Sequence, residues 1–324
     1  MASPLLQVDT DLLRRFEDQL DPLHPEVGKI PARVLGYGEI STVLEINGDG
    51  RYAYKRMPLF ASQAELDAYQ RVYVEYNRLL TEEIGLRLPA YGFAGLVTAS
   101  GRWVAYAVQE KLDPASIGNR LIHRLSTADV QRLVRQLLAD LARVWRFNQS
   151  QTRVQVGLDG QISNWSVVGL DPYGLRLNPA VSLRYVDTST PLFRVDGQEQ
   201  LHAELFLRSA PSFLAWILRR FVLADVVNRY YDLHRVTVDL VANFYKEQLP
   251  DLIPGLVETI NDFFAHEVGD LPVAPLSAAE VRAYYREDAL IWRFYLGARR
   301  IDRFLHRRLL RREYPYILPI IRQR

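Results

Sequence analysis

Two features near the start of the chain could bind an anion such as a phosphate. Residues 36–43 begin with Gly36 and Gly38, whose missing side chains let backbone N–H groups approach phosphate oxygens closely. Lys55 follows in the strand-like segment 52–55, and only four of the 40 basic residues are lysines. Each feature also has a plain structural interpretation, since glycine pairs are common in hairpins and a strand lysine is commonly a solvated edge residue.

Four polar side chains further along could hold a metal ion or move a proton. Glu75 lies in a helix-like segment, Asp159 and Asn164 lie five residues apart in the loop-like segment 157–165, and Asp187 ends an apolar strand-like segment. Carboxylate and amide oxygens are the ligands that Mg²⁺ prefers, and a carboxylate can accept a proton. A single helix glutamate is more commonly a surface residue. The order and spacing of the set therefore carry the functional interpretation.

The elements expected to position these residues are β-rich at first. Hydrophobic spacing and turn residues predict a short helix over 8–20, a helix over 62–84 and strands over 33–46, 51–59, 91–99 and 102–112. The predicted helix 62–84 has an apolar stripe at helical intervals, formed by Leu66, Tyr69, Tyr73, Tyr76 and Leu80.

The pattern becomes mainly helical after residue 113. We expect a helix over 126–148, a hairpin within 153–187 with its turn at 171–174, and helices over 211–312 that are broken near Pro250, Pro254 and Pro272–Pro275. No flexible linker separates the halves, so the sequence predicts one α+β domain with two lobes, residues 1–113 and 114–324.

Composition excludes several classes of protein. The chain of 324 residues is 48% hydrophobic and 24% charged, which is typical of a globular protein, and no apolar run is long enough to span a membrane. The absence of cysteine excludes disulfides and thiolate sites, and with no secretory signal it favours a cytoplasmic location. The net charge of +2 argues against a protein that binds nucleic acid over its whole surface.

Three further features concern possible binding sites, and two of them have alternative interpretations. Residues 296–312 form a basic helix, for which packing with a solvated arginine face is the expected role and binding of nucleic acid or another acidic partner is the alternative. The six histidines show no metal-ligand spacing, so we expect no zinc site. Aromatic residues around 229–232 and 284–295 either pack helix against helix, which we favour, or line a substrate pocket.

The ordered set of glycine-rich turn, strand lysine, helix glutamate, Asp-x4-Asn loop and strand-end aspartate resembles the protein-kinase-like superfamily. Within it, the resemblance is greatest to the aminoglycoside and choline phosphotransferase-like kinases. It covers residues 33–190 by motif. It implies a two-lobed fold with a small antiparallel β-rich N-lobe and a larger helical C-lobe.

The resemblance also implies a role for each residue. The segment with Gly36, Gly38, Ser41 and Val43 would cover the phosphates of ATP, and Lys55 would contact the α- and β-phosphates while Glu75 holds it. Glu110 and Leu112, within the segment 109–112, would meet the adenine through backbone hydrogen bonds. Asp159 would accept the proton of the attacking hydroxyl, and Asn164 and Asp187 would hold Mg²⁺.

Several positions depart from the family pattern. Ser41 replaces the third glycine of the loop, and Gly157 replaces a histidine or tyrosine that anchors the catalytic loop. Gln161 replaces a basic side chain, and the metal motif reads Asp187-Thr188-Ser189. These departures bear more on catalysis than on fold.

Three functions are therefore considered. The first is an ATP- and Mg²⁺-dependent phosphotransferase whose partners are a nucleotide and a hydroxyl-bearing small molecule. A small acceptor is favoured because no Ala-Pro-Glu-type activation segment follows Asp187. The second is a nucleotide-binding pseudokinase that serves as a scaffold or regulatory module, and the third is a transferase of AMP with the same fold.

Overall fold

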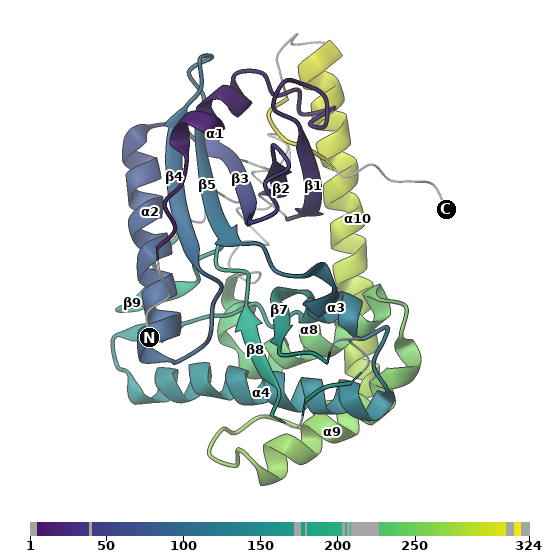
Figure 1. Ribbon diagram of the computed structural model, residues 1–324. Coiled ribbons are helices and arrows are strands. Elements are labelled where there is room, and N and C mark those ends of the chain that lie inside the picture. The colour runs from purple at the N-terminus through teal and green to yellow at the C-terminus, as the bar shows by residue number, and fades with distance from the viewer. Residues whose placement is uncertain are drawn as a thin grey trace.

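The structure is a computed structural model that describes residues 5–38, 41–171, 176–178, 180–202, 205, 208, 227–308 and 314–318, without the side chains of residues 292, 294, 296 and 307. The chain forms two lobes, one built on an antiparallel sheet and one mainly helical (Figure 1). Part of the predicted glycine-rich segment (residues 39 and 40), part of the predicted hairpin turn (172–174) and residues 211–226 and 309–312 of the predicted helical region lie outside the described residues.

The N-lobe contains a five-stranded sheet in the order β1-β2-β3-β5-β4, in which every neighbouring pair is antiparallel. Its strands are β1 (Ala32–Tyr37), β2 (Thr42–Ile46), β3 (Tyr52–Phe60), β4 (Tyr91–Val97) and β5 (Trp103–Glu110). Asn47 and Gly48 connect β2 to β3 with left-handed backbone angles, φ 56° and 67°, as a tight hairpin turn requires.

Each face of this sheet is covered by one helix, because side chains alternate between the faces of a strand. On one face, Leu13 and Phe16 of α1 (Thr10–Glu17) share a buried cluster with Tyr106 of β5. On the other face, Tyr69 and Tyr73 of α2 (Gln63–Arg78) pack in a cluster with the alternate residues of β5. The side-chain oxygen of Ser62 caps α2, and a π-helical turn, η1 (Leu79–Glu83), continues it.

The C-lobe is built on helices that share the largest hydrophobic core of the described residues. They are α3 (Gly118–Leu121), α4 (Thr127–Ser150), α8 (Leu233–Lys246), α9 (Ile253–His266) and α10 (Ala278–Arg308). The predicted helix 126–148 is therefore present as α4, with Ser126 as its N-cap. The break predicted near Pro250 and Pro254 separates α8 from α9, and that at Pro272–Pro275 separates α9 from α10.

Two further small sheets are formed by strands that follow α4 in the chain. The hairpin expected within 153–187 is formed by β7 (Trp165–Val168) and β8 (Ser182–Tyr185), which pair antiparallel. Strands β6 (Val154–Val156), β9 (Phe193–Val195) and β10 (Gln198–Glu199) form a second sheet, which the sequence did not predict. The short 3₁₀ turns η3 (Ile162–Asn164) and η4 (Arg229–Tyr231) lie in the loops that precede β7 and α8.

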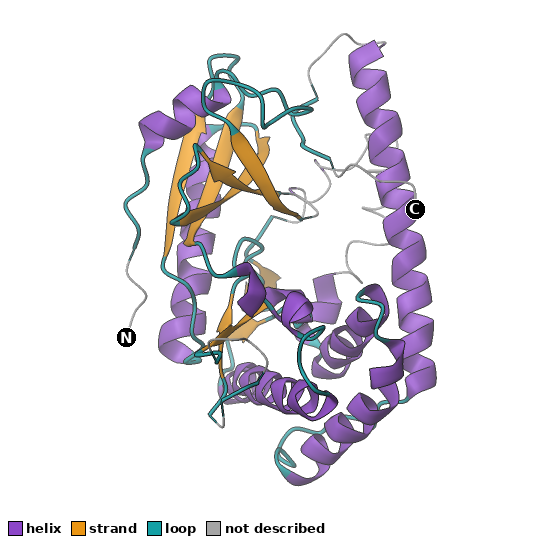
Figure 2. Cartoon of the chain, turned by 45° about the vertical axis from the view of Figure 1, so that its right-hand side comes forward, coloured by secondary structure: helices purple, strands orange, loops and turns teal. Residues whose placement is uncertain are grey.

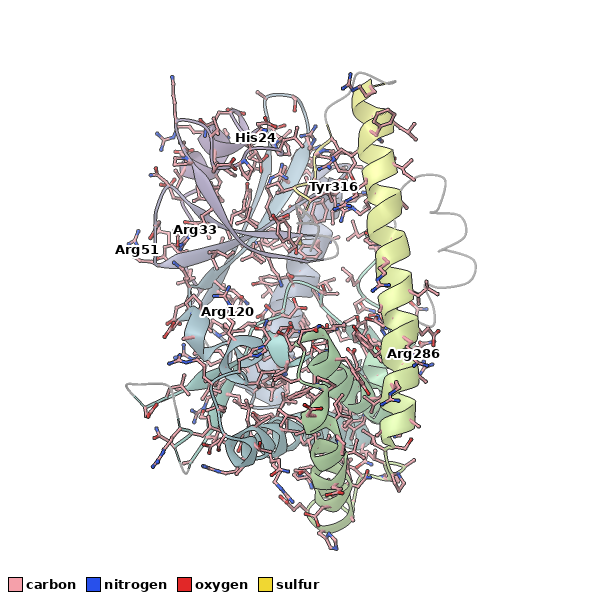
Figure 3. All side chains as sticks on the ribbon, turned by 90° about the vertical axis from the view of Figure 1, so that its right-hand side faces the viewer. His24, Arg33, Arg51, Arg120, Arg286 and Tyr316 are labelled. Carbon is pink, nitrogen blue, oxygen red and sulfur yellow. The ribbon has the colours of Figure 1, made fainter. Side chains whose placement is uncertain are left out.

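The long helix α10 runs beside both lobes (Figure 2). Its 31 residues make it about 46 Å long at ~1.5 Å per residue. Near its C-terminal end the guanidinium of buried Arg299 lies 4.8 Å from the ring centre of Tyr316, which is labelled beside the helix in Figure 3. Ile317 packs on the N-lobe, in the cluster that contains Leu13 and Phe16.

The segment 314–318 is also held to the sheet by hydrogen bonds. Arg56 donates to the carbonyl oxygen of Pro315 at 2.7 Å, and the Thr42 hydroxyl donates to that of Ile317 at 3.3 Å. Arg56 is itself buried in a bidentate ion pair with Glu17, at 2.6 and 2.8 Å. The C-terminal segment is thus an integral part of the N-lobe.

The predicted α+β fold with two lobes is confirmed: the chain has a small antiparallel sheet lobe and a larger, mainly helical lobe. Within the described residues, no helix combines the length and apolar character needed to cross a bilayer.

Candidate functional site

Lys55 and Asp187, which are 132 residues apart in the sequence, form an ion pair between the lobes. The Lys55 Nζ lies 2.5 Å from the Asp187 Oδ1, and the two side chains are 18% and 21% exposed. Lys55 lies in β3, and Asp187 follows the end of β8. The Ser189 hydroxyl also donates to Asp187 Oδ1, at 3.4 Å. Because both charges are partly accessible, a ligand could reach them.

The glycine-rich segment forms the β1–β2 hairpin next to Lys55. Val43 pairs with Gly36 on one side and with Lys55 on the other, so the hairpin and the lysine are neighbours in the sheet. The Gly38 amide donates to the carbonyl oxygen of Ser41 at 2.9 Å. A Cβ at residue 38 would lie 2.7 Å from the Ser41 hydroxyl oxygen, so a side chain there would require that hydroxyl to move.

Asp159 and Asn164 lie in a loop that is closed by its own hydrogen bonds. The Gln161 amide donates to Asp159 Oδ1 at 3.1 Å, and the Asn164 Nδ2 donates to the carbonyl oxygen of Asp159 at 3.3 Å. The Val186 amide donates to the carbonyl oxygen of Asn164 at 2.9 Å. This last bond holds Asn164 beside the residue that precedes Asp187, so the two predicted metal ligands come from adjacent backbone segments.

The electrostatic environment of Asp159 favours its protonated form. Burial, and then the negative charges of Asp239 and Asp187, raise the pKa of Asp159 to about 8, while the hydrogen bond from Gln161 and the charge of Arg229 oppose the shift. A carboxyl group whose pKa lies near neutrality can take and release a proton under ordinary conditions.

Asp239 is a site residue that the sequence reasoning missed. It lies in α8, is only 6% exposed, and its Oδ2 accepts a hydrogen bond of 3.1 Å from the Gln161 side chain. Burial raises the pKa of Asp239, and the charges of Lys246 and Arg229 oppose this shift. An acid inside the apolar run 236–242 was the signal that could have identified it.

Two cations and a second acid extend this network. The Lys246 Nζ lies 3.0 Å from Asp288 Oδ2, and Arg229 lies 3.7 Å from Asp288 Oδ1. Arg229 also donates to the hydroxyl of Tyr284 at 3.1 Å. Residues 229 and 284 belong to the aromatic segments noted in the sequence, and here they join η4 to α10 near Asp239.

The expectation that Glu75 holds Lys55 is wrong. The Glu75 side chain is 44% exposed and forms an ion pair of 2.9 Å with Arg78, one turn further along α2. Residue 75 lies about 100° around the helix from the buried Tyr76, so its side chain is turned away from the site. The buried side of α2 presents tyrosines to the site instead. Tyr69 donates to the carbonyl oxygen of Ser189 at 2.6 Å.

The loop that contains Asp159 and Asn164 is anchored despite Gly157, contrary to the expectation from the sequence. The Tyr76 hydroxyl of α2 donates to the carbonyl oxygen of Gly157 at 3.0 Å, and the Gly157 amide donates to the carbonyl oxygen of Leu192 at 2.8 Å. A Cβ at residue 157 would lie 3.0 Å from the carbonyl oxygen of Tyr230, so a larger residue would crowd the loop.

The segment 109–112 leaves β5 at the junction of the lobes. The amides of Glu110 and Lys111 already donate to the carbonyl oxygens of Ala90 and Arg51, both at 2.8 Å. Among the hydrogen bonds of the described residues, none involves the amide of Leu112. The amide of Leu112 is therefore available to donate to a ligand.

The described residues contain no group of three or more histidine, aspartate or glutamate side chains placed to hold one metal ion. A cation at the predicted position would have two protein ligands, the amide oxygen of Asn164 and the carboxylate of Asp187. These are hard oxygen donors, which fit Mg²⁺, an ion that commonly keeps several waters or takes phosphate oxygens.

Comparison with known proteins assigns the chain to a family. Residues 26–304 match the family model described as "Family of unknown function (DUF6206)", so the chain belongs to this family. A solved structure described as "WaaP in complex with acyl carrier protein" is similar over 81% of this chain and 89% of that chain, with 14% sequence identity and a TM-score of 0.32. A search of curated proteins finds no match.

Proposed function

We propose that this member of the DUF6206 family is an ATP- and Mg²⁺-dependent phosphotransferase that acts on a hydroxyl group of a small molecule. The observation that carries the proposal is the convergence of Lys55, Asp159, Asn164 and Asp187 at the junction of the lobes, beside the glycine hairpin. Phosphoryl transfer depends on positioning and charge neutralisation, and these groups supply both.

Asn164 and Asp187 are the proposed ligands of Mg²⁺, which would neutralise charge on the phosphates of the nucleotide. Lys55 forms an ion pair with Asp187. With Mg²⁺ held by Asp187, the ammonium group of Lys55 would be available to contact the α- and β-phosphates. Leu112 would donate its amide hydrogen to a ring nitrogen of the adenine.

Asp159 is the proposed proton acceptor for the attacking hydroxyl. Its raised pKa favours the protonated form near neutral pH. Mg²⁺ held by Asn164 and Asp187 would add positive charge nearby and would favour the deprotonated form of Asp159, which can accept the proton of the hydroxyl.

A pseudokinase that binds nucleotide without transferring phosphate is the second candidate. The pairing of Glu75 with Arg78 favours it, because Lys55 then lacks the glutamate partner that the resemblance implies. The tyrosine contacts of α2 hold the loops in place but supply no carboxylate to Lys55.

The test is a thermal-shift measurement with ATP and Mg²⁺, followed by an assay of ATP consumption with a panel of hydroxylated small molecules. We expect ATP with Mg²⁺ to raise the melting temperature of the wild type and of Lys29→Ala, an exposed control, but not of Lys55→Ala or Asp187→Ala. Asp159→Asn should bind the nucleotide and consume none.

Equal shifts in the wild type, Lys55→Ala and Asp187→Ala would refute the site. A normal shift in the wild type without ATP consumption across the panel would favour the pseudokinase.

A further inference from the structure

A cavity of about 760 Å³ lies beside α2. Of the residues predicted to bind nucleotide or Mg²⁺, only Glu75 lines it, and Glu75 pairs with Arg78 instead of Lys55. One wall is a face of α2 with small and apolar residues, namely Ala64, Ala68, Val72 and Leu79. The described part of the opposite wall comes from the β6–β9 sheet and the segment after it, with Val154, Phe193, Val195, Leu201 and Leu205. The volume lies within the range of small-molecule sites.

The cavity is elongated along the helix. Its lining runs from Ala64 to Leu79, which corresponds to about 22 Å at ~1.5 Å per residue. Ala64 and Ala68 supply little side-chain volume, so they leave a channel between the helix and the opposite wall. A long, narrow, mainly apolar molecule fits such a space better than a compact polar one.

The charges around the cavity leave one cation uncompensated. Glu65 forms a bidentate ion pair with Arg208 at 2.5 and 2.8 Å, and Glu75 pairs with Arg78. Arg71, an exposed residue on the same face of α2, forms no ion pair with any other residue in the described part of the chain. Among the described lining residues, the cavity therefore combines a mainly apolar wall with the positive charge of Arg71, which no described carboxylate compensates.

We propose that this cavity binds an elongated, mainly apolar molecule that ends in one anionic group, of the chemical class of a long-chain carboxylate. The apolar chain would lie along Ala64, Ala68 and Val72, and the carboxylate would pair with Arg71. This site goes beyond the proposed phosphotransferase activity, and its occupancy can be measured without nucleotide.

The position of the cavity connects it to the candidate active site. Tyr69 lines the cavity and donates its hydroxyl hydrogen to the carbonyl oxygen of Ser189, two residues after Asp187. Phe193 also lines the cavity and stacks on Tyr76, with ring centres 6.4 Å apart, and Tyr76 anchors Gly157. A molecule in the cavity thus contacts two side chains whose neighbours hold the catalytic loop and the metal motif.

The first experiment measures binding of laurate to the full chain by isothermal titration calorimetry, below the concentration at which laurate forms micelles. We expect the wild type to bind laurate at one site and Ala68→Trp, in which the indole fills the cavity, to lose at least about tenfold in affinity. Gln70→Trp is the matched control, because Gln70 is exposed on the same helix outside the cavity and should leave affinity unchanged.

The second experiment separates the apolar contact from the charge. Arg71→Ala should weaken laurate binding about tenfold, as loss of a charge-assisted hydrogen bond predicts, and leave the binding of lauryl alcohol unchanged. Absence of laurate binding to the wild type, or equal affinity of the wild type and Ala68→Trp, would overturn the proposal. If circular dichroism shows Ala68→Trp to be unfolded, Ala64→Trp replaces it with the same expected result.

Discussion

Replacement of Asp159 by asparagine is expected to stabilise the folded protein near neutral pH while it removes the proposed base. In the folded state the pKa of Asp159 is raised from 3.8 to about 8, chiefly by burial and then by Asp239 and Asp187. The folded state therefore binds a proton more tightly than the unfolded state. Between these two pKa values, the unfolding free energy of the wild type falls as the pH rises.

The size of the effect follows from the shift. Each unit of pKa corresponds to about 1.36 kcal/mol, so three units between the ordinary pKa and pH 7 give a ceiling of about 4 kcal/mol. Asp159 is partly exposed, and water reduces the penalty. We expect Asp159→Asn to gain about 1–3 kcal/mol at pH 7, since asparagine keeps an acceptor for the Gln161 amide.

Urea unfolding, followed by circular dichroism at a series of pH values, measures this difference. The gain of Asp159→Asn over the wild type should be small near pH 4 and should increase until about pH 8. Asp251→Asn, at an exposed aspartate of the same lobe, is the control and should change little. A gain that is independent of pH, or a loss at pH 7, would refute the assignment of a partly buried, protonated Asp159.

Two further predictions concern stability. Arg56→Met should lower the unfolding free energy in urea by about 3–5 kcal/mol, because it leaves Glu17 buried without its partner. The double variant Arg56→Met with Glu17→Leu should recover most of that loss. A single variant as stable as the wild type would contradict the buried pair. Gly118→Ala should destabilise the protein by about 1–3 kcal/mol, because the new Cβ would overlap the Ile162 carbonyl oxygen, in the loop that contains Asp159 and Asn164. Gly297→Ala, within α10 and with open space around it, should instead stabilise the protein by about 0.5–1 kcal/mol, and equal effects of the two alanines would contradict this packing.

The sequence predicted the sheet lobe well because its strands and turns are specified locally. The Gly36–Gly38 turn, the Asn47–Gly48 turn and the alternating strands lie within short segments, and each could be identified without knowledge of the rest of the chain. The proximity of Lys55 and Asp187 required more, since it followed only from a family resemblance and not from any local pattern.

The error at Glu75 was avoidable from the same pattern that predicted its helix. The stripe of Leu66, Tyr69, Tyr73, Tyr76 and Leu80 marks the buried side of α2, and residue 75 lies off that stripe. The family resemblance implies that Glu75 contacts Lys55, whereas the helical geometry places Glu75 on the exposed side of α2. By contrast, Asp239 was missed because a single acid in an apolar helix gives no indication of which loop it will face.

Contacts that join distant segments could not be predicted at all. Arg56 reads as an ordinary strand arginine, and its partners Glu17 and Pro315 lie 39 and 259 residues away. Hydrophobic periodicity reports which side of an element is buried but not what covers it. The segment 314–318 has no regular secondary structure, so no periodic pattern marked it as part of the N-lobe core.

The attachment of segment 314–318 to the sheet has a consequence for how the protein folds during synthesis. The Thr42 hydroxyl and the Ile317 carbonyl oxygen are 275 residues apart, so the cluster around Leu13 and Phe16 is incomplete until residue 317 has left the ribosome. Translation proceeds at about 5–20 residues per second, and domains ordinarily fold from the N-terminus onward. Here the core of the N-lobe is translated before the C-lobe but is completed only after it.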